Sequence, residues 1–357
     1  MSETARPSPG LDASFVHKAL FVAGLIVLMA LVWKLANVLL LAFAAVIIAV
    51  LVRSLADPIR ERTGLGTGPS LILASLSILA VLAGSGWLFG STVASQVDAL
   101  ADRIPRSLAE LEALLATLPF GSQLAVQLDG AGAAPDLQSM VGRVSGYVVS
   151  VIGAGANLLL VVFAGLFFAA QPGRMRDGLL LLVPPRPREP MREAANESGR
   201  ALRLWLAGTL ADMVVVGVLT GVGTALIGLP SPIALGLFAG LAAFVPIVGP
   251  IVSVVPAVLL ALDQGPQMIL LTVGVYFLVQ QIESNLIYPF IQKRAVDLPP
   301  VLTLFGVLGL GTLFGPLGVV FASPLLVVGL VWIKMLYIRN ALGEDIPLPG
   351  RSDADSV

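Results

Sequence analysis

The feature that most constrains this chain is a succession of apolar segments, most of them long enough to form a helix across a lipid bilayer. A spanning helix needs about 20 mostly apolar residues. The five clear segments are Ala19–Trp33, Leu35–Val52, Ser70–Ala94, Val148–Ala170 and Ala201–Ile227, with a tight turn expected at Lys34. Because lipid offers the backbone no hydrogen-bond partners, and because the pattern lacks the alternating short strands of a barrel, these segments are predicted to be helices. The expected fold class is an all-α integral membrane protein.

The composition supports this class and argues against several functions. Hydrophobic residues make up 57% of the chain and charged residues 12%, against roughly 45–50% and about 25% in soluble proteins. The net charge is −1, there is no Cys, and the one His, His17, lies near the N-terminus. These counts argue against nucleic-acid binding, metal sites built from Cys or His, and thiol or Ser-His-Asp catalysis. We therefore expect no catalytic residue, no metal site and no cofactor, and we expect that the chain is not an enzyme.

Residues 95–147, between the third and fourth apolar segments, follow a different pattern. From Val97 to Leu118 an apolar residue recurs at helical spacing, and charged residues fill the positions between. Such a segment forms an amphipathic helix that lies on a membrane or on a partner. The segment is net acidic, whereas residues 171–200 are rich in Arg. Since basic connections stay in the cytoplasm, residues 95–147 are predicted to be extracytoplasmic and both termini cytoplasmic.

The C-terminal part contains two pairs of apolar segments, each pair separated by a Pro/Gly break. The first pair is Pro232–Val245 and Ile251–Leu262, and the second is Pro300–Leu313 and Leu317–Tyr337. The shorter segments, of 12–14 residues, reach only about 20 Å, less than the ~30 Å hydrocarbon core. Pro disfavours a continuous helix through each break, so both pairs are predicted to be re-entrant hairpins. An alternative is that they cross a locally thinned bilayer.

The loop charges put the entries of the two hairpins on opposite sides of the membrane, with Pro266–Ile287 as a span between them. This is the pattern of an inverted-topology repeat, whose broken helices commonly form a site near the midplane. The break residues Pro246, Gly249, Pro250, Gly315 and Gly318 are therefore candidate site residues, because their neighbourhood leaves backbone polar groups without helical partners. The alternatives are that composition alone makes the hairpins alike, and that their tips are buried for tight packing.

Polar side chains inside the apolar segments complete the candidate site. Asp212 lies well inside the fifth segment, where a carboxylate is costly unless it is paired, protonated or facing water. Tyr276, Gln280 and Glu283 share one helix face by their spacing, and Gln281 and Asn285 lie on a neighbouring face. Together they predict a solute or ion pathway. The competing interpretation makes Asp212 a hydrogen-bonded packing residue and pairs Glu283 with Lys293 or Arg294.

Three motifs in the C-terminal part resemble the autoinducer-2 exporter family of bacterial membrane proteins. They are Phe244-Val245-Pro246-Ile247-Val248-Gly249-Pro250, the stretch from Gln280-Gln281-Ile282-Glu283 to Tyr288-Pro289, and Leu313-Phe314-Gly315-Pro316-Leu317-Gly318 with the following Ala322-Ser323-Pro324-Leu325. Pro299 stands where the family more often has His, and Lys293 where Gly is usual, so a proton relay through that His would be missing. The N-terminal half matches only in layout.

The resemblance implies a multi-pass transporter of the bacterial plasma membrane that forms homo-oligomers. Members of the family have been assigned to autoinducer export and to sodium(lithium)/proton antiport, so the expected partners are the lipid bilayer, a small solute, and sodium or protons, without nucleic acid. The alternatives are a passive oligomeric channel and a structural membrane protein.

The expected organisation has about seven full crossings plus the two hairpins. Its parts are a cytoplasmic N-terminus (1–18), three transmembrane helices (19–94), the extracytoplasmic amphipathic segment (95–147), a transmembrane helix (148–170), the cytoplasmic Arg-rich connection (171–200), a transport core with the two hairpins (201–338) and a cytoplasmic tail (339–357).

Overall fold

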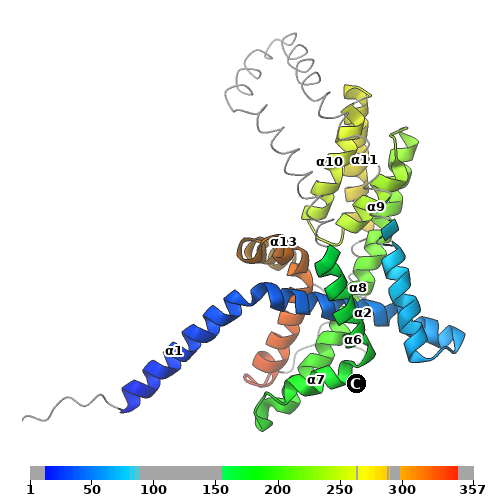
Figure 1. Cartoon of the computed structure of the whole chain (residues 1–357). Helices are drawn as coiled ribbons and strands as arrows, with labels where there is room; N and C mark the ends of the chain where they lie inside the picture. The colour runs from blue at the N-terminus through cyan, green and yellow to red at the C-terminus, as the bar shows by residue number, and fades with distance from the viewer. Residues whose placement is uncertain are drawn as a thin grey trace, which may run out of the picture.

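The computed structural model describes residues 13–81, 83–84, 87, 155–262, 264–287, 289 and 298–344, and the elements in these ranges are all helical (Figure 1). By length and composition, four described helical stretches are long and apolar enough to cross a membrane: Ala36–Thr63, Pro185–Leu226, Pro266–Ile287 and Pro300–Arg339. The last of them contains a non-helical break at Gly315. The prediction of an all-α membrane protein is thus confirmed. The predicted amphipathic segment, 95–147, lies outside the described residues.

The first two helices, α1 (Ala13–Lys34) and α2 (Ala36–Thr63), follow one another at a bend. The Leu35 amide donates to the Leu31 carbonyl and the Leu39 amide to the Leu35 carbonyl, both at 2.9 Å, so helical hydrogen bonds continue through the junction. The tight turn predicted at Lys34 is therefore wrong. A single charged residue does not end a helix when neither Pro nor Gly follows it, and α1 instead extends away from the other helices (Figure 1).

A small bundle forms around α2, a helix over Thr67–Val81 and α6 (Gly155–Ala170). A Cβ on Gly165 of α6 would lie 2.7 Å from the Ile48 side chain, so the missing side chain lets α2 and α6 approach closely. The Nε of Arg53 donates to the Ala169 carbonyl at 2.7 Å, which satisfies a backbone acceptor at the end of α6.

The longest helix is α8 (Pro185–Leu226), with 42 residues. At 1.5 Å per residue it is about 63 Å long, twice the ~30 Å hydrocarbon core. It joins the predicted fifth span to most of the predicted Arg-rich connection without a break, and the short α7 (Pro172–Leu180) precedes it. Ion pairs of 3.1 Å tie Arg203 to Asp57 of α2 and Glu193 to Arg339.

The first predicted hairpin consists of α9 (Pro232–Ala242) and α10 (Val248–Leu262), which contact each other. A Cβ on Gly249 would lie 1.9 Å from the Ala242 carbonyl oxygen, so only Gly permits the limbs to meet this closely. Between them Ile247 has φ +70°, a left-handed conformation that is costly for a β-branched residue.

The second predicted hairpin lies within α13 (Pro300–Trp332), where Gly315 has the non-helical angles φ 65° and ψ −149°. The chain folds back at this residue, because Gly318 abuts the Leu310 carbonyl and Gly306 abuts the Leu326 side chain. The π-helical segment η2 (Ile333–Arg339) continues the second limb. Both Pro/Gly breaks therefore separate two helical limbs that lie against each other.

Among the described helices, α8 and α9 make the most extensive contact, and glycines lie on both sides of it. A Cβ on Gly236 of α9 would lie 2.5 Å from the Gly217 carbonyl oxygen, and one on Gly240 would lie 2.6 Å from the Met213 carbonyl oxygen. Gly217 and Gly221 on α8 oppose Gly236 and Gly240 on α9, each pair four residues apart. This is the small-residue spacing by which membrane helices bring their backbones together.

Candidate functional site

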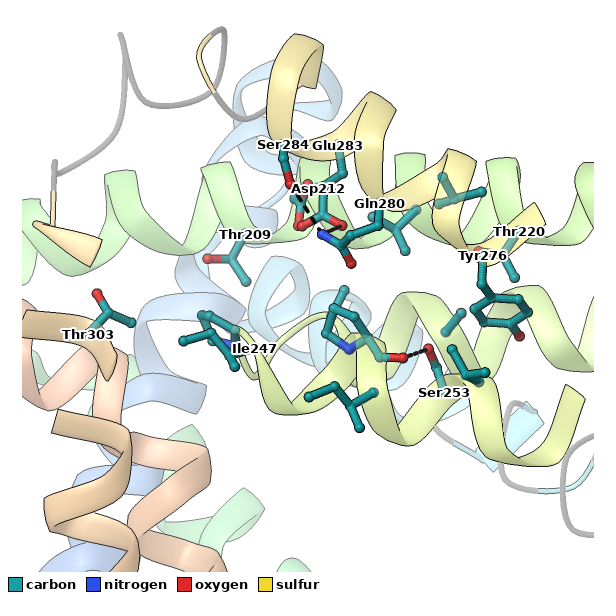
Figure 2. Close-up of a pocket in the computed structure, with 18 of the residues that line it drawn as sticks. Thr209, Asp212, Thr220, Ile247, Ser253, Tyr276, Gln280, Glu283, Ser284 and Thr303 are labelled. Carbon is teal, nitrogen blue, oxygen red and sulfur yellow. Dashed lines mark hydrogen bonds between the residues drawn. The ribbon is translucent and has the colours of Figure 1, made fainter. Parts of the chain in front are cut away.

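A cavity of about 730 Å³ lies between α8, the α9–α10 hairpin, α11 (Pro266–Ile282), the π-helical turn η1 (Glu283–Ile287) and α13 (Figure 2). Its polar lining comes from side chains within otherwise apolar helices. These are Thr209, Asp212 and Thr220 from α8, Ser253 from α10, Tyr276 and Gln280 from α11, Glu283 and Ser284 from η1, and Thr303 and Ser323 from α13.

Helical periodicity explains why these residues face one cavity. On α8, Asp212, Val216 and Thr220 recur at intervals of four, so they share a face. On α11, Tyr276 and Gln280 follow the same rule, and η1 adds Glu283 at the next turn. The two helices contact each other and run antiparallel, since Asp212 lies near Glu283 and Thr220 near Tyr276 (Figure 2).

One end of the cavity, here called the acid end, contains Asp212, Gln280 and Glu283. The Gln280 amide donates to a Glu283 carboxylate oxygen at 3.0 Å, which fixes that carboxylate against α11. One carboxylate oxygen of Asp212 is buried and has no hydrogen-bond partner among the described residues. The two acids lie close enough for their charges to interact. Their proximity makes the acid end a place that attracts a proton or a cation.

The other end, here called the hydroxyl end, contains Thr220, Ser253 and Tyr276. Thr220 and Tyr276 are 1% and 8% exposed, and within the described part of the chain neither hydroxyl has a hydrogen-bond partner. The Ser253 hydroxyl donates to the Pro250 carbonyl at 2.8 Å and so satisfies a carbonyl near the start of α10. Buried hydroxyls without partners are rare in folded proteins, and each one calls for an explanation.

Both hairpins contribute to the lining. The break between α9 and α10 supplies Pro246 and Ile247, and α10 adds Pro250. The second hairpin adds Thr303 from its first limb and Ser323 from its second. The strained Ile247 thus stands at the cavity, as strained backbone often does at functional sites.

The candidate residues predicted from the sequence separate into two groups. Those that line the cavity are Asp212, Tyr276, Gln280, Glu283, Pro246 and Pro250. Those that do not are Gln281, Asn285, Gly249, Gly315 and Gly318. Asn285 donates to the Gln281 carbonyl at 2.9 Å on an exposed face, and the three glycines serve the limb contacts and the fold-back of the hairpins. Lys293 and Arg294, the alternative partners of Glu283, lie outside the described residues.

The sequence pattern predicted Tyr276 but not the Ser and Thr hydroxyls of the lining. Thr209 and Thr220 could have been found, because they lie one and two turns from Asp212 on the same face. Ser253, Thr303 and Ser323 come from three other helical stretches, and only their packing around the cavity brings them together.

The chemistry available in the cavity is binding through oxygen atoms. Its described lining combines two carboxylates, an amide and several hydroxyls with apolar side chains, and it contains no Lys, Arg or His. Within the described residues no group of three or more His, Cys, Asp and Glu could hold a metal ion. The arrangement can bind and release a proton, a monovalent cation or a polar solute.

Comparison with known proteins points to transport. A sequence profile described as the AI-2E family transporter matches residues 21–338. The candidate transport protein YueF of Bacillus subtilis is 23% identical over 268 residues, which cover 71% of this chain and 73% of YueF. The candidate transport protein YrrI of the same organism is 33% identical over 120 residues, 34% of each chain. The candidate permease PerM of Escherichia coli is 27% identical over 173 residues, which cover 48% of this chain and 49% of PerM. The match thus spans about a third of YrrI and half of PerM.

Proposed function

Because this chain belongs to the AI-2E transporter family, we propose that it is a secondary transporter that exports a small solute or signal molecule through the cavity described above. The family makes the chain a multi-pass membrane transporter. The observation that carries the finer proposal is the placement of two carboxylates, Asp212 and Glu283, in a cavity lined by helices of membrane-spanning length. Acids at such positions are costly in lipid and mark ion or substrate pathways.

The proposed mechanism is alternating access at the two hairpins. Transporters built on broken helices bind their substrates where the breaks meet, and rocking or gating elements expose the site to either side. Here the first hairpin contributes Pro246 and Ile247 at its break, and the second contributes Thr303 and Ser323 from opposite limbs. A movement of either hairpin would therefore change the cavity wall directly. We propose that both hairpins are re-entrant.

The proposed coupling groups are Asp212 and Glu283. A proton or sodium ion bound at the acid end offsets the repulsion between the two carboxylates, and its release restores that repulsion. Ion binding and solute binding at one site would then exclude each other, which is the basis of exchange. The same observation favours a second candidate function, sodium(lithium)/proton antiport, in which the acid end binds the two ions in turn.

The membrane location and the assembly belong to the same proposal. We place the chain in the bacterial inner membrane with both termini in the cytoplasm, on the side of the Arg-rich α7 and the first half of α8. We further propose a homo-oligomer in which α1 contributes to the subunit contact. Its described apolar side chains, such as Ile26 and Met29, are exposed at 63% and 73%, so lipid or a second copy must cover them.

The test is a flux measurement in proteoliposomes that contain only the purified protein. A sodium or proton gradient is imposed, and internal pH and sodium are followed together. We expect opposed, coupled movement that is lost in Asp212→Asn and Glu283→Gln and kept in the control Glu189→Gln, an acid whose side chain is 83% exposed on α8. Flux that follows each gradient without coupling would instead indicate a passive channel. Full coupling in both cavity variants would refute the assigned role of the acids.

A further inference from the structure

We propose that the solute of this cavity is an amphipathic organic cation, with a protonated amine at the acid end and a hydrogen-bonding group at the hydroxyl end. This assignment rests on the proposed function and deepens it, since it names the chemical class of the solute. Four features of the cavity support it: its charge, the spacing of its polar groups, its unpartnered hydroxyls and its apolar wall.

The charge of the lining selects against anions. Asp212 and Glu283 are its two acids, and its described residues include no basic side chain. A phosphate or carboxylate placed here would meet like charge in a region of low dielectric constant. A protonated amine carries three N–H donors. One carboxylate oxygen of Asp212 has no hydrogen-bond partner within the described residues, so it is an acceptor for one of these donors. The acid end therefore matches an ammonium group in both charge and hydrogen bonding.

The spacing of the polar groups sets the length of the solute. Asp212 and Thr220 are eight residues apart on α8, which corresponds to about 12 Å along the helix axis. Tyr276 and Glu283 are seven residues apart on α11 and η1, which corresponds to about 10 Å. The helices pack in antiparallel register. Gly223 of α8 abuts Val275 of α11, just beyond Thr220 and Tyr276 at the hydroxyl end. The acid end and the hydroxyl end are thus about 10–12 Å apart along the helix axes.

The hydroxyl end has unused hydrogen-bonding capacity. A threonine in a helix commonly donates to a carbonyl of the preceding turn, as Thr224 does to the Thr220 carbonyl at 2.7 Å. Within the part of the chain that the structure describes, the hydroxyls of Thr220 and Tyr276 make no hydrogen bond, although both residues are at least nine-tenths buried. Both hydroxyls line the cavity. A hydroxyl or carbonyl of a bound solute would give each of them a partner.

The wall between the two ends is apolar. The apolar residues of the lining include Val216, Ala239, Ala243, Val254 and Val279. A cavity of about 730 Å³ lies within the ~300–1,000 Å³ range of sites for drug-sized ligands, far more than one bare ion needs. An alkyl or aromatic body would fill this space and gain from removal of its surface from water. The coupling ion and the amine would then compete for the same carboxylates.

The experiment measures equilibrium binding of a ligand series to the full-length protein in lipid nanodiscs. The series contains a linear amino alcohol with its amine and hydroxyl about 10 Å apart, shorter and longer amino alcohols, the matching alkylamine, the matching alkanol and an alkyl sulfate. We expect the 10 Å amino alcohol to bind most tightly, the alkylamine about tenfold more weakly for one lost pair of hydrogen bonds, and the alkyl sulfate not to compete. Raising the sodium or proton concentration should weaken binding of the amines and leave the alkanol unchanged.

Variants assign each end of the solute to its end of the cavity. Asp212→Asn should weaken both amines by more than tenfold and leave the alkanol unchanged. Tyr276→Phe, which removes one oxygen, should weaken the amino alcohol about fivefold and leave the alkylamine unchanged. The matched control is Thr272→Val. Thr272 on α11 is fully buried and does not line the cavity, and its hydroxyl has no hydrogen-bond partner among the residues described. It should leave every affinity unchanged.

Three results would overturn the assignment. The first is that the alkyl sulfate competes as well as the amines do. The second is that neither Asp212→Asn nor Tyr276→Phe changes amine binding, which would indicate only partition into an apolar space. The third is the absence of amine binding to a protein that performs coupled flux in proteoliposomes, which would leave the transporter proposal standing and remove the substrate class. Amine binding with the expected variant pattern but without any flux would support the ligand class and refute the transporter proposal.

Discussion

Replacement of Gly236 by Ala should separate two helices that line the cavity. A Cβ at this position would lie 2.5 Å from the Gly217 carbonyl oxygen and 2.9 Å from the Gly221 Cα. These are backbone atoms, so no rotamer change relieves the clash. Comfortable contacts between carbon atoms need about 3.5–4.0 Å, and α8 and α9 would have to move apart by about 1 Å.

The cost of this separation follows from the packing it disrupts. Adding one methyl group to a closely packed contact typically costs about 1–3 kcal/mol. The α8–α9 contact also positions Val216 and Ala239, which belong to one hydrophobic cluster and both line the cavity. We therefore expect Gly236→Ala to lower the free energy of unfolding by about 1–3 kcal/mol and to reduce the transport rate more than stability alone explains.

The assay pairs denaturant unfolding in mixed micelles with flux in proteoliposomes. The control is Gly309→Ala, the same substitution at a glycine of α13 whose Cβ would meet no atom of the described residues within 4 Å. It should be neutral or slightly stabilising, since Ala favours a helix by up to about 1 kcal/mol. Equal stability and equal flux for Gly236→Ala and Gly309→Ala would refute the inference that the glycines set the distance between α8 and α9.

Three further substitutions have defined outcomes. Gly318→Ala, whose Cβ would lie 2.0 Å from a carbonyl of the opposite limb, should open the second hairpin and abolish flux, and retained flux would contradict the close limb contact. Arg53→Met removes the 2.7 Å hydrogen bond to the Ala169 carbonyl and should lower the free energy of unfolding by about 1.5–3 kcal/mol, measured by denaturant unfolding. Arg53→Lys should fall between the original protein and Arg53→Met. Arg203→Ala removes an ion pair with Asp57 in which both side chains are partly exposed, so it should cost less than about 1 kcal/mol and less still in high salt.

The helical character of the chain and its breaks could be predicted from composition and local sequence. Long apolar runs leave the backbone no alternative to a helix in lipid, and Pro with Gly marks both hairpin breaks because each disturbs helical hydrogen bonding locally. Local rules are less useful at Lys34, where they predict a turn although the flanking residues continue the helix. They also missed the continuity of α8, whose polar first half and apolar second half look like separate elements.

The candidate site could be predicted only in part, because helix spacing fixes which residues share a face and not which helices meet. Asp212 and the Tyr276–Gln280–Glu283 stripe were each found from their own helix, and their meeting depends on the antiparallel packing of α8 against α11. The glycines of the α8–α9 contact were present in the sequence at four-residue spacing. Their role becomes evident only once both helices are known, because a single small-residue motif does not indicate which helix packs against it.

The length of α8 has a consequence for how movement at the cavity can be observed and controlled. One continuous helix, α8, carries Asp212 at the cavity and Glu193 several turns away, where Glu193 pairs with Arg339. A tilt of α8 that widens the cavity would therefore also move its polar N-terminal half, which lies outside the hydrocarbon core. The chain contains no native Cys. A spectroscopic label on one Cys introduced into the polar half of α8 would therefore report the conformation of the cavity. A protein that binds the polar N-terminal half of α8 would in turn hold the transporter in one conformation.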